Sequence, residues 1–324
     1  MPRRSRPHRL AMLAWSLNLA GAAALLAVLG LYYGGKSARA GGGATMPLEE
    51  GPGMSSARAP LAWGYLPTVT PNPRATPIIL SSPTPFILQG GGRPRVIGTS
   101  VAGRALELYQ FGTGPRKRMI VGGIHGGHEW NTIALADQII AHVDANPDVI
   151  PADVTLYILR DLNPDGDARA HSYLGRVNDR GVDLNRNFPV NWQKEWDRDG
   201  CWDLVPTTAG AEPGSEPETR ALMGFLLTHP VEVLISLHSA ALGVFPGGVP
   251  WDADSVRFAK TLAAVTDYPF PPIETGCVYT GTLADYAVSR GATAVDMELS
   301  NHEDTDFDRN LDALQVLLKW NREP

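Results

Sequence analysis

Short apolar runs rich in β-branched residues alternate along this 324-residue chain with longer segments that carry apolar residues every three or four positions. The first pattern is typical of buried strands and the second of amphipathic helices. Their alternation predicts an α/β fold: a mixed, mostly parallel central sheet with helices on both faces. We expect strands at Val96–Thr99, Ala105–Phe111, Met119–Gly122, Val154–Leu159, Val231–Leu237 and Thr293–Glu298. We expect helices at Asn131–Ala145, Pro217–Thr228, Ala253–Val265, Thr282–Arg290 and Asp306–Trp320.

The first 40 residues differ from the rest of the chain in charge and in apolar content. They hold six basic residues, and the first acidic residue is Glu49. Leu10–Tyr33 is an apolar run longer than the roughly 20 residues that span a bilayer as a helix. The Arg-rich flank before it favours a cytoplasmic N-terminus. We therefore expect residues 1–33 to be a basic flank and transmembrane anchor, with the remainder outside the cytoplasm.

The alternative is a cleaved signal peptide, because Ala38-Arg39-Ala40 fits a small-x-small cleavage site. Residues 34–94 are rich in Gly, Pro, Ser and Thr, which predicts an extended linker before a single domain at 95–324. Beyond residue 40 the chain has 22 of its 28 basic residues against 34 acidic ones. This acidic balance argues against nucleic acid as a partner.

The two cysteines, Cys201 and Cys277, are too few for a disulfide scaffold. A location outside the cytoplasm permits one bridge between them. Two free buried thiols are the alternative, since the sequence does not give their separation in space.

Histidine and glutamate residues stand at the ends of three predicted strands. The third strand leads through glycines to His125, His128 and Glu129, the fifth leads to His238, and the sixth ends in Glu298. Open α/β sheets bind ligands at the carboxyl ends of such strands. Two imidazoles and one carboxylate form a catalytic zinc set that leaves a coordination position for water. The sequence therefore predicts one zinc ion near these residues.

The pair His128-Glu129 does not begin an HExxH motif, because Thr132 stands where the second histidine is required. We expect His128 to form a hydrogen bond near the metal. Ligation by His128 in place of Glu129 is the alternative.

Further motifs follow one another in an order that resembles the M14 family of zinc carboxypeptidases, of the smaller bacterial kind. The resemblance covers about Ile97 to Leu318 and rests on Gly98–Arg104, His125–Glu129, Asn163–Gly166, Gly181–Phe188, Leu237–Ser239 and Met297–Leu299. It implies that residues 95–324 form a catalytic domain that hydrolyses the amide bond next to a free C-terminal carboxylate. It also implies zinc ligation by His125, Glu129 and His238.

One departure from the family concerns the spacing of the ligands. The family usually has two residues between the first histidine ligand and the glutamate, and this chain has three. We expect Gly126 and Gly127 to absorb the additional residue, because glycine reaches backbone conformations closed to other residues.

The resemblance also implies roles for residues outside the metal set. Asn185 and Arg186 would bind the terminal carboxylate of the substrate, a task suited to an amide donor and a planar guanidinium. Arg176 would stabilise the oxyanion, and Tyr279 would cap the substrate. Glu298 would act first as general base and then as general acid.

Asp296 precedes Glu298 by two residues on one predicted strand, so the two side chains should face the same side. By resemblance this position lines the pocket for the C-terminal side chain. A carboxylate there favours C-terminal Lys, Arg or an amine-bearing cell-wall residue such as diaminopimelate. An internal pair with an arginine such as Arg290 is the alternative. Peptides or cell-wall stem peptides are the expected substrates, because the domain is expected outside the cytoplasm.

Two other functions are compatible with the same motifs. One is a zinc-dependent deacylase that acts on N-acyl amino acids. The other is a surface binding module with an inactive catalytic core, which only the altered spacing around Glu129 suggests.

Overall fold

The computed structural model describes residues 94–201 and 206–322. The predicted anchor at 1–33 and all but the last residue of the predicted linker lie outside these ranges. Within them, no helix combines the length and the apolar character that crossing a bilayer requires.

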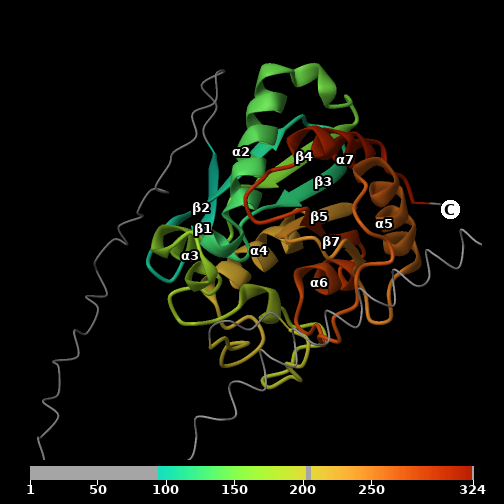
Figure 1. Cartoon of the computed structure of the whole chain (residues 1–324). Helices are drawn as coiled ribbons and strands as arrows, with labels where there is room; N and C mark the ends of the chain where they lie inside the picture. Colours follow the sequence, from blue (N-terminus) through green and yellow to red (C-terminus); the bar gives the residue numbers. More distant parts are fainter. Residues whose placement is uncertain (1–93, 202–205, 323–324) are drawn as a thin grey trace, which may run out of the picture. The chain divides into compact units, whose positions relative to one another are not determined.

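The described residues form a seven-stranded sheet with the order β1-β2-β4-β3-β5-β7-β6 (Figure 1). Strands β4, β3, β5 and β7 pair in parallel, whereas the pairs β1·β2, β2·β4 and β6·β7 are antiparallel. The mixed sheet with its parallel centre confirms the predicted fold class. The strands are β1 (Arg95–Thr99), β2 (Ala105–Phe111), β3 (Arg116–Val121), β4 (Val154–Leu159), β5 (Val233–Ser239), β6 (Val244–Pro246) and β7 (Thr293–Leu299).

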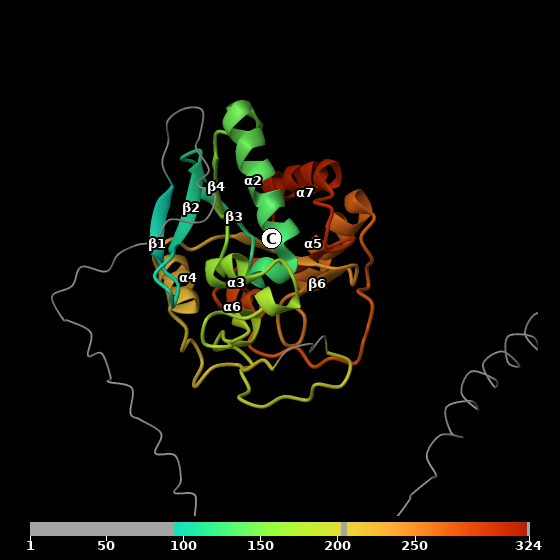
Figure 2. The same cartoon turned by 60° about the vertical axis from the view of Figure 1, so that its left-hand side comes forward.

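Helices cover both faces of this sheet, as the sequence predicts (Figures 1 and 2). One apolar core joins the sheet to α2, α5 and α7, and a second core joins the opposite face to α4 and α6. The α-helices are α2 (Trp130–Ala145), α3 (Pro164–Arg169), α4 (Pro217–Thr228), α5 (Ala253–Thr266), α6 (Leu283–Ser289) and α7 (Phe307–Lys319). Short 3-10 segments include η2 (Gly126–Glu129), η4 (Tyr173–Gly175) and η5 (Leu184–Arg186).

The pairing of β5 with β7 brings polar side chains together on one face. In the parallel register His238 stands beside Glu298, and Ser236 stands beside Asp296. Side chains alternate between the faces of a sheet, so all four lie on the face that α4 and α6 cover. The residues between them point into the other core, and they are Ile235, Leu237, Val295 and Met297.

The observed strand ends correct the predicted ones. Strand β5 begins at Val233 and continues to Ser239, so His238 lies inside the strand instead of following it. Glu298 likewise lies within β7, which ends at Leu299. Sheet hydrogen bonds therefore fix the backbone of both residues.

Candidate active site

A glycine-rich loop carries the chain from β3 to α2. Gly126 has φ +47°, and a Cβ there would stand 2.8 Å from the carbonyl oxygens of Asn163 and Gly175. A Cβ on Gly127 would stand 2.2 Å from the carbonyl oxygen of Ala170. The two glycines therefore let the loop turn as η2 against the α3 and η4 segments.

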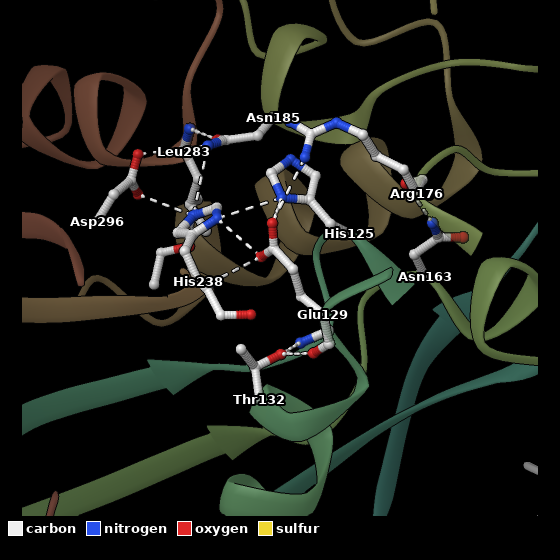
Figure 3. Close-up of polar contacts among 12 residues, drawn as sticks. His125, Glu129, Thr132, Asn163, Arg176, Asn185, His238, Leu283 and Asp296 are labelled. Atoms are coloured by element: carbon white, nitrogen blue, oxygen red, sulfur yellow. Dashed lines mark hydrogen bonds and ion pairs between the residues drawn. The ribbon is translucent and has the colours of Figure 1, made fainter. Parts of the chain in front are cut away.

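Thr132, on the first turn of α2, closes this loop (Figure 3). Its hydroxyl donates to the backbone carbonyl of Glu129 at 2.7 Å and accepts from the backbone N–H of Gly123 at 3.1 Å. Thr132, which stands where an HExxH motif requires a histidine, thus links Gly123 and Glu129 at the two ends of the loop.

Three buried side chains converge at the centre of the site (Figure 3). The Nδ1 atom of His125 lies 2.7 Å from Glu129 Oε1, and the Nδ1 atom of His238 lies 3.3 Å from Glu129 Oε2. The two Nδ1 atoms are 3.3 Å apart. Of the described residues, only this group of at least three His, Cys, Asp or Glu ligand atoms lies within 4.8 Å of one another. Two imidazoles and a carboxylate are a donor set that zinc favours.

The outer nitrogen of each imidazole has its own partner. His125 Nε2 lies 3.2 Å from Asp183 Oδ1, and His238 Nε2 lies 3.0 Å from Ser236 Oγ. Such outer contacts fix the tautomer and ring orientation of histidine ligands. The residues present therefore fit a zinc ion held through the Nδ1 atoms and Glu129.

Neighbouring charges oppose the effect of burial on the pKa values of Glu129 and His238. Burial alone would raise the pKa of Glu129, but His125 and His238 hold it well below its ordinary value. Burial would lower the pKa of His238, but Asp296 and Glu129 raise it well above its ordinary value. The carboxylate of Glu129 is therefore ionised and ready to serve as a ligand.

His128 lies apart from this group. Its ring centroid is 4.8 Å from that of His302, and its buried Nδ1 has no hydrogen-bond partner among the described residues. The structure thus brings Glu129, and not His128, together with His125 and His238.

Arg176 is held beside the metal set by the Asn163–Gly166 motif. The side chain of Asn163 caps α3 by accepting from Gly166 N at 3.0 Å, and it donates to the carbonyl of Arg176 at 3.0 Å. The Arg176 guanidinium then contacts Asp183 Oδ2 at 3.0 Å and Glu129 Oε1 at 3.4 Å.

Arg186 lies in the part of the cavity wall that Trp196 and Tyr279 form, and a disulfide bond joins the loops of these two residues. Its Cζ is 5.3 Å from the ring centroid of Tyr279 and 5.8 Å from that of Trp196, and its buried Nε has no hydrogen-bond partner within residues 94–201 and 206–322. Cys277 and Cys201 form a disulfide, so the bridged alternative of the two sequence hypotheses is the observed one. The bridge joins the loop of Trp196 to the loop of Tyr279.

Asn185 and Asp296 lie on the other side of the metal set (Figure 3). Asn185 Oδ1 accepts from the backbone N–H of Leu283, and its Nδ2 donates to Asp296 Oδ2 at 3.3 Å. Asp296 Oδ1 lies 3.5 Å from His238 Nε2. The suggested pair between Asp296 and Arg290 is not formed, because Arg290 is an exposed residue at the end of α6.

Glu298 faces the same centre and has an unpartnered oxygen. Its Oε2 is buried without a hydrogen-bond partner in the described part of the chain. Burial and the nearby charge of Glu129 raise the pKa of Glu298 to about 8. A carboxyl group with a pKa near neutrality is suited to both accepting and donating a proton.

A single cavity of about 590 Å³ contains all of the residues that the sequence predicts for the site. These lining residues are His125, Glu129, Arg176, Asn185, Arg186, His238, Tyr279, Asp296 and Glu298.

Asp183, Ser236 and Asp285 also lie at the site, and the sequence did not single them out. Asp183 belongs to the Gly181–Phe188 motif, and Ser236 precedes His238 by one strand repeat. Side chains two residues apart on a strand face the same side, so the position of Ser236 two residues before His238 could have indicated that it lies at the site. Asp285 carried no such signal, since its place at the cavity depends on how α6 packs.

Comparisons with known proteins agree with this geometry. The family model described as zinc carboxypeptidase matches residues 93–314. Carboxypeptidase B of Astacus astacus is 30% identical over 189 residues, which are 52% of this chain and 61% of the relative. Murein peptide amidase A of Escherichia coli K12 is 32% identical over 133 residues, 39% of this chain and 50% of the relative. The matches thus span about half to three-fifths of the length of these relatives.

Solved structures show the same fold. The murein-tripeptide amidase of Escherichia coli O157 superposes with a TM-score of 0.55 at 22% identity, over 72% of this chain and 94% of that one. The carboxypeptidase A of Helicoverpa armigera superposes with a TM-score of 0.55 at 19% identity, over 68% of this chain and 65% of that one. Since the family model covers more than half of the chain, this protein belongs to the M14 family of zinc carboxypeptidases.

Proposed function

We propose that this protein is a metallocarboxypeptidase that hydrolyses the amide bond next to a free C-terminal carboxylate. One observation carries the proposal. A single cavity joins the metal-ligand set to a carboxylate oxygen of Glu298 and a guanidinium nitrogen of Arg186, neither of which has a hydrogen-bond partner among the described residues. The first is suited to moving a proton and the second to binding an anion.

The proposed roles follow from these positions. His125, Glu129 and His238 would hold a zinc ion, which would supply a Lewis acid and lower the pKa of a bound water. Glu298 takes a proton from the attacking water and then delivers it to the leaving amine nitrogen. Arg176, beside the metal set, stabilises the negative charge that develops on the substrate carbonyl oxygen.

The substrate carboxylate would lie against the wall of Arg186. Burial lowers the pKa of this guanidinium, but Asp183 raises it, and an arginine remains charged at neutral pH. Tyr279 lies half exposed beside it and would cover the bound residue. An amidated C-terminus would leave the buried Arg186 without an anionic partner, so the enzyme should reject it.

A comparison of three substrate types tests this function. The zinc-loaded protein should hydrolyse a peptide with a free C-terminus much faster than the same peptide with a C-terminal amide. Preference for an N-acyl amino acid would favour the deacylase alternative. Absence of zinc and of all hydrolysis would favour a binding module.

We also propose that the catalytic domain acts outside the cytoplasm on peptides or cell-wall stem peptides. The Cys201–Cys277 disulfide supports the location, because such bonds persist in oxidising compartments. Similarity to a murein peptide amidase supports the cell-wall substrate. Cell fractionation with and without residues 1–33 tests whether this segment anchors the domain, and purified stem peptides test the substrate.

A further inference from the structure

The Cys201–Cys277 disulfide is itself part of the active-site cavity. Both cysteines line the cavity, and each is partly exposed. The Sγ atom of Cys277 lies 3.9 Å from the Nη2 atom of Arg186. A small reductant can therefore reach the bridge, and reduction would leave a thiol beside the arginine that is proposed to bind the substrate carboxylate.

Arg186 forms no ion pair within residues 94–201 and 206–322. Its Nη1 donates to the backbone carbonyl of Asn185 at 2.9 Å, and its buried Nε has no hydrogen-bond partner there. Burial lowers the pKa of Arg186, and Asp183 is near enough to oppose this effect, but the carboxylate of Asp183 contacts His125 and Arg176. The guanidinium of Arg186 is therefore a buried positive charge that attracts any anion within its reach.

Contacts other than the bridge hold the loop of Cys277 beside Arg186. The backbone N–H of Phe188 donates to the carbonyl of Gly281 at 3.0 Å. On the loop of the other cysteine, a Cβ on Gly200 would stand 2.9 Å from the backbone nitrogen of Cys277, so glycine lets the two loops touch. A thiol released at Cys277 should therefore stay next to Arg186.

Other charged groups near the bridge do not replace Arg186. In the described part of the chain, Arg186 is the only cationic side chain that contacts Cys277. Arg198 lies over the ring of Trp196 at 4.1 Å and donates to Thr207. The further ionisable residues of the two loops are exposed, and they are Asp197, Asp199, Glu274 and Tyr279. A negative charge on Cys277 would therefore face Arg186.

Reduction supplies such a negative charge. A dithiol that attacks the bridge transfers two electrons and two protons to it and becomes a disulfide itself, which leaves two cysteine thiols. A positive neighbour favours the thiolate over the thiol, because it stabilises the negative sulfur. The thiolate of Cys277 would pair with Arg186 at the position that the substrate carboxylate would occupy.

We propose that Cys201 and Cys277 form a redox switch of the carboxylate-binding site. The disulfide form binds substrate, whereas in the dithiol form the Cys277 thiolate pairs with Arg186 and competes with the substrate. The inference rests on the proposed carboxypeptidase function and adds its regulation. A chain made in a reducing cytoplasm would thus gain activity when the bridge forms in an oxidising compartment.

Two single variants separate the thiolate from the loss of the bridge. Cys201→Ser and Cys277→Ser both lack the disulfide, but only Cys201→Ser leaves a thiol beside Arg186. For a peptide with a free C-terminus, Cys201→Ser should have a KM about 10- to 100-fold higher than that of Cys277→Ser, the scale of a hydrogen bond between charged groups. The kcat values of the two variants should agree, because the thiolate competes with substrate binding.

The pH dependence of the KM ratio identifies the thiolate. The ratio should be largest at about pH 8 and above, and it should fall as lower pH protonates the thiol. Effects of pH on the zinc site are common to both variants and cancel in the ratio. A phosphine keeps the thiols reduced, because thiol reductants also bind zinc. Elemental analysis checks that both variants retain equal zinc.

The wild type gives a second measurement that needs no substitution. The phosphine reduces the bridge with one water molecule, giving two thiols and the phosphine oxide. The KM of the wild type should rise on reduction and return to its first value on reoxidation. This comparison decides the proposal if either single variant does not fold.

The ultraviolet absorbance of the thiolate tests the contact without turnover. In Cys201→Ser the thiolate should form at a lower pH than in the double variant Cys201→Ser/Arg186→Gln, which lacks the positive neighbour. Equal titration curves would show that Arg186 does not stabilise the thiolate, and they would overturn the switch.

The outcomes separate the two proposals. Equal KM values for the two single variants at every pH overturn the switch and leave the carboxypeptidase function standing. A wild-type KM that is unchanged after complete reduction overturns it as well. If the disulfide form hydrolyses no peptide with a free C-terminus, the carboxypeptidase function fails and the switch of that function fails with it.

Discussion

His125 and His238 differ in the side chain that contacts Nε2, the ring nitrogen that points away from the candidate metal position. For His125 this partner is Asp183, which also binds Arg176, and for His238 it is the hydroxyl of Ser236. Removing a carboxylate that orients a histidine ligand commonly weakens metal binding 10- to 100-fold. Asp183→Asn should therefore lower zinc affinity by about that factor, measured by competition with a chromogenic chelator.

Asp179→Asn is the matched control, because Asp179 pairs with Arg169 away from the metal set. It should bind zinc like the wild type. Equal zinc affinity in Asp183→Asn and Asp179→Asn would show that Asp183 does not support His125.

Glu298 should be needed for turnover and not for metal binding. Glu298 lines the cavity, its Oε2 has no hydrogen-bond partner in the part of the chain that the structure describes, and it contributes none of the three grouped ligand atoms. Glu298→Gln should retain zinc yet lose about 10²- to 10⁴-fold in kcat, the scale of a positioned acid/base. Elemental analysis and steady-state kinetics measure the two effects, and loss of zinc from this variant would place Glu298 among the ligands instead.

The candidate site residues could be predicted from sequence because they stand at or near the ends of recognisable strand patterns. His125, Glu129, His238 and Glu298 were expected to meet, and one cavity contains them. Asp183 and Asp285 could not be assigned in the same way. Their roles depend on side-chain contacts between segments that are distant in the sequence, and an aspartate in a loop or helix has many other uses.

At the level of elements, the buried side chain of Glu218 connects the first turn of α4 to Val101 and Asn178. Glu218 is fully buried, its Oε1 accepts from the backbone N–H of Val101 at 2.9 Å, and its Oε2 contacts Asn178 Nδ2 at 3.2 Å. Burial raises the pKa of Glu218 from 4.5 to about 7. This carboxyl therefore binds its proton more tightly in the folded protein than in the unfolded chain.

The sign of the pH effect follows from that difference. A carboxyl with a raised pKa stabilises the fold when protonated, so its contribution is complete below about pH 4.5 and is lost as the pH rises through about 7. The free energy of unfolding of the wild type, relative to Glu218→Gln, should fall between pH 5 and pH 8. Urea denaturation of both proteins measures it, and a constant difference across this range would contradict the raised pKa.

The predicted helices and strands largely match the observed ones, and the exceptions have local causes. The helix Pro217–Thr228 is observed with the predicted bounds, because proline at its start and a continuous apolar repeat mark it. Strand β6 and helix α3 were not predicted. Val244–Pro246 has only three residues, and Pro164–Arg169 is a six-residue helix whose cap belongs to the Asn163–Gly166 motif. Segments this short carry too few residues for a periodic pattern.

At the level of the molecule, the Cys201–Cys277 disulfide links residues that are 76 positions apart. A crosslink over a segment of that length removes unfolded-chain entropy worth on the order of 4 kcal/mol. Replacing both cysteines by serine should lower the free energy of unfolding by up to about that amount. It should also raise KM, because the bridge supports the wall beside Arg186. Urea denaturation and kinetics measure these effects, and unchanged values for both would show that packing alone holds the wall.

Because β5 and β7 pair in register, we expect this protein not to tolerate insertions or deletions within either strand. His238 and Glu298 stand side by side, and the residues that precede them, Leu237 and Met297, belong to the opposite core. Deleting one residue inside either strand would turn its polar side chain into that core and bring an apolar side chain to the cavity. Surface loops between the strands have no such constraint. Natural insertions and deletions in related enzymes should therefore gather in those loops and be absent from the two strands.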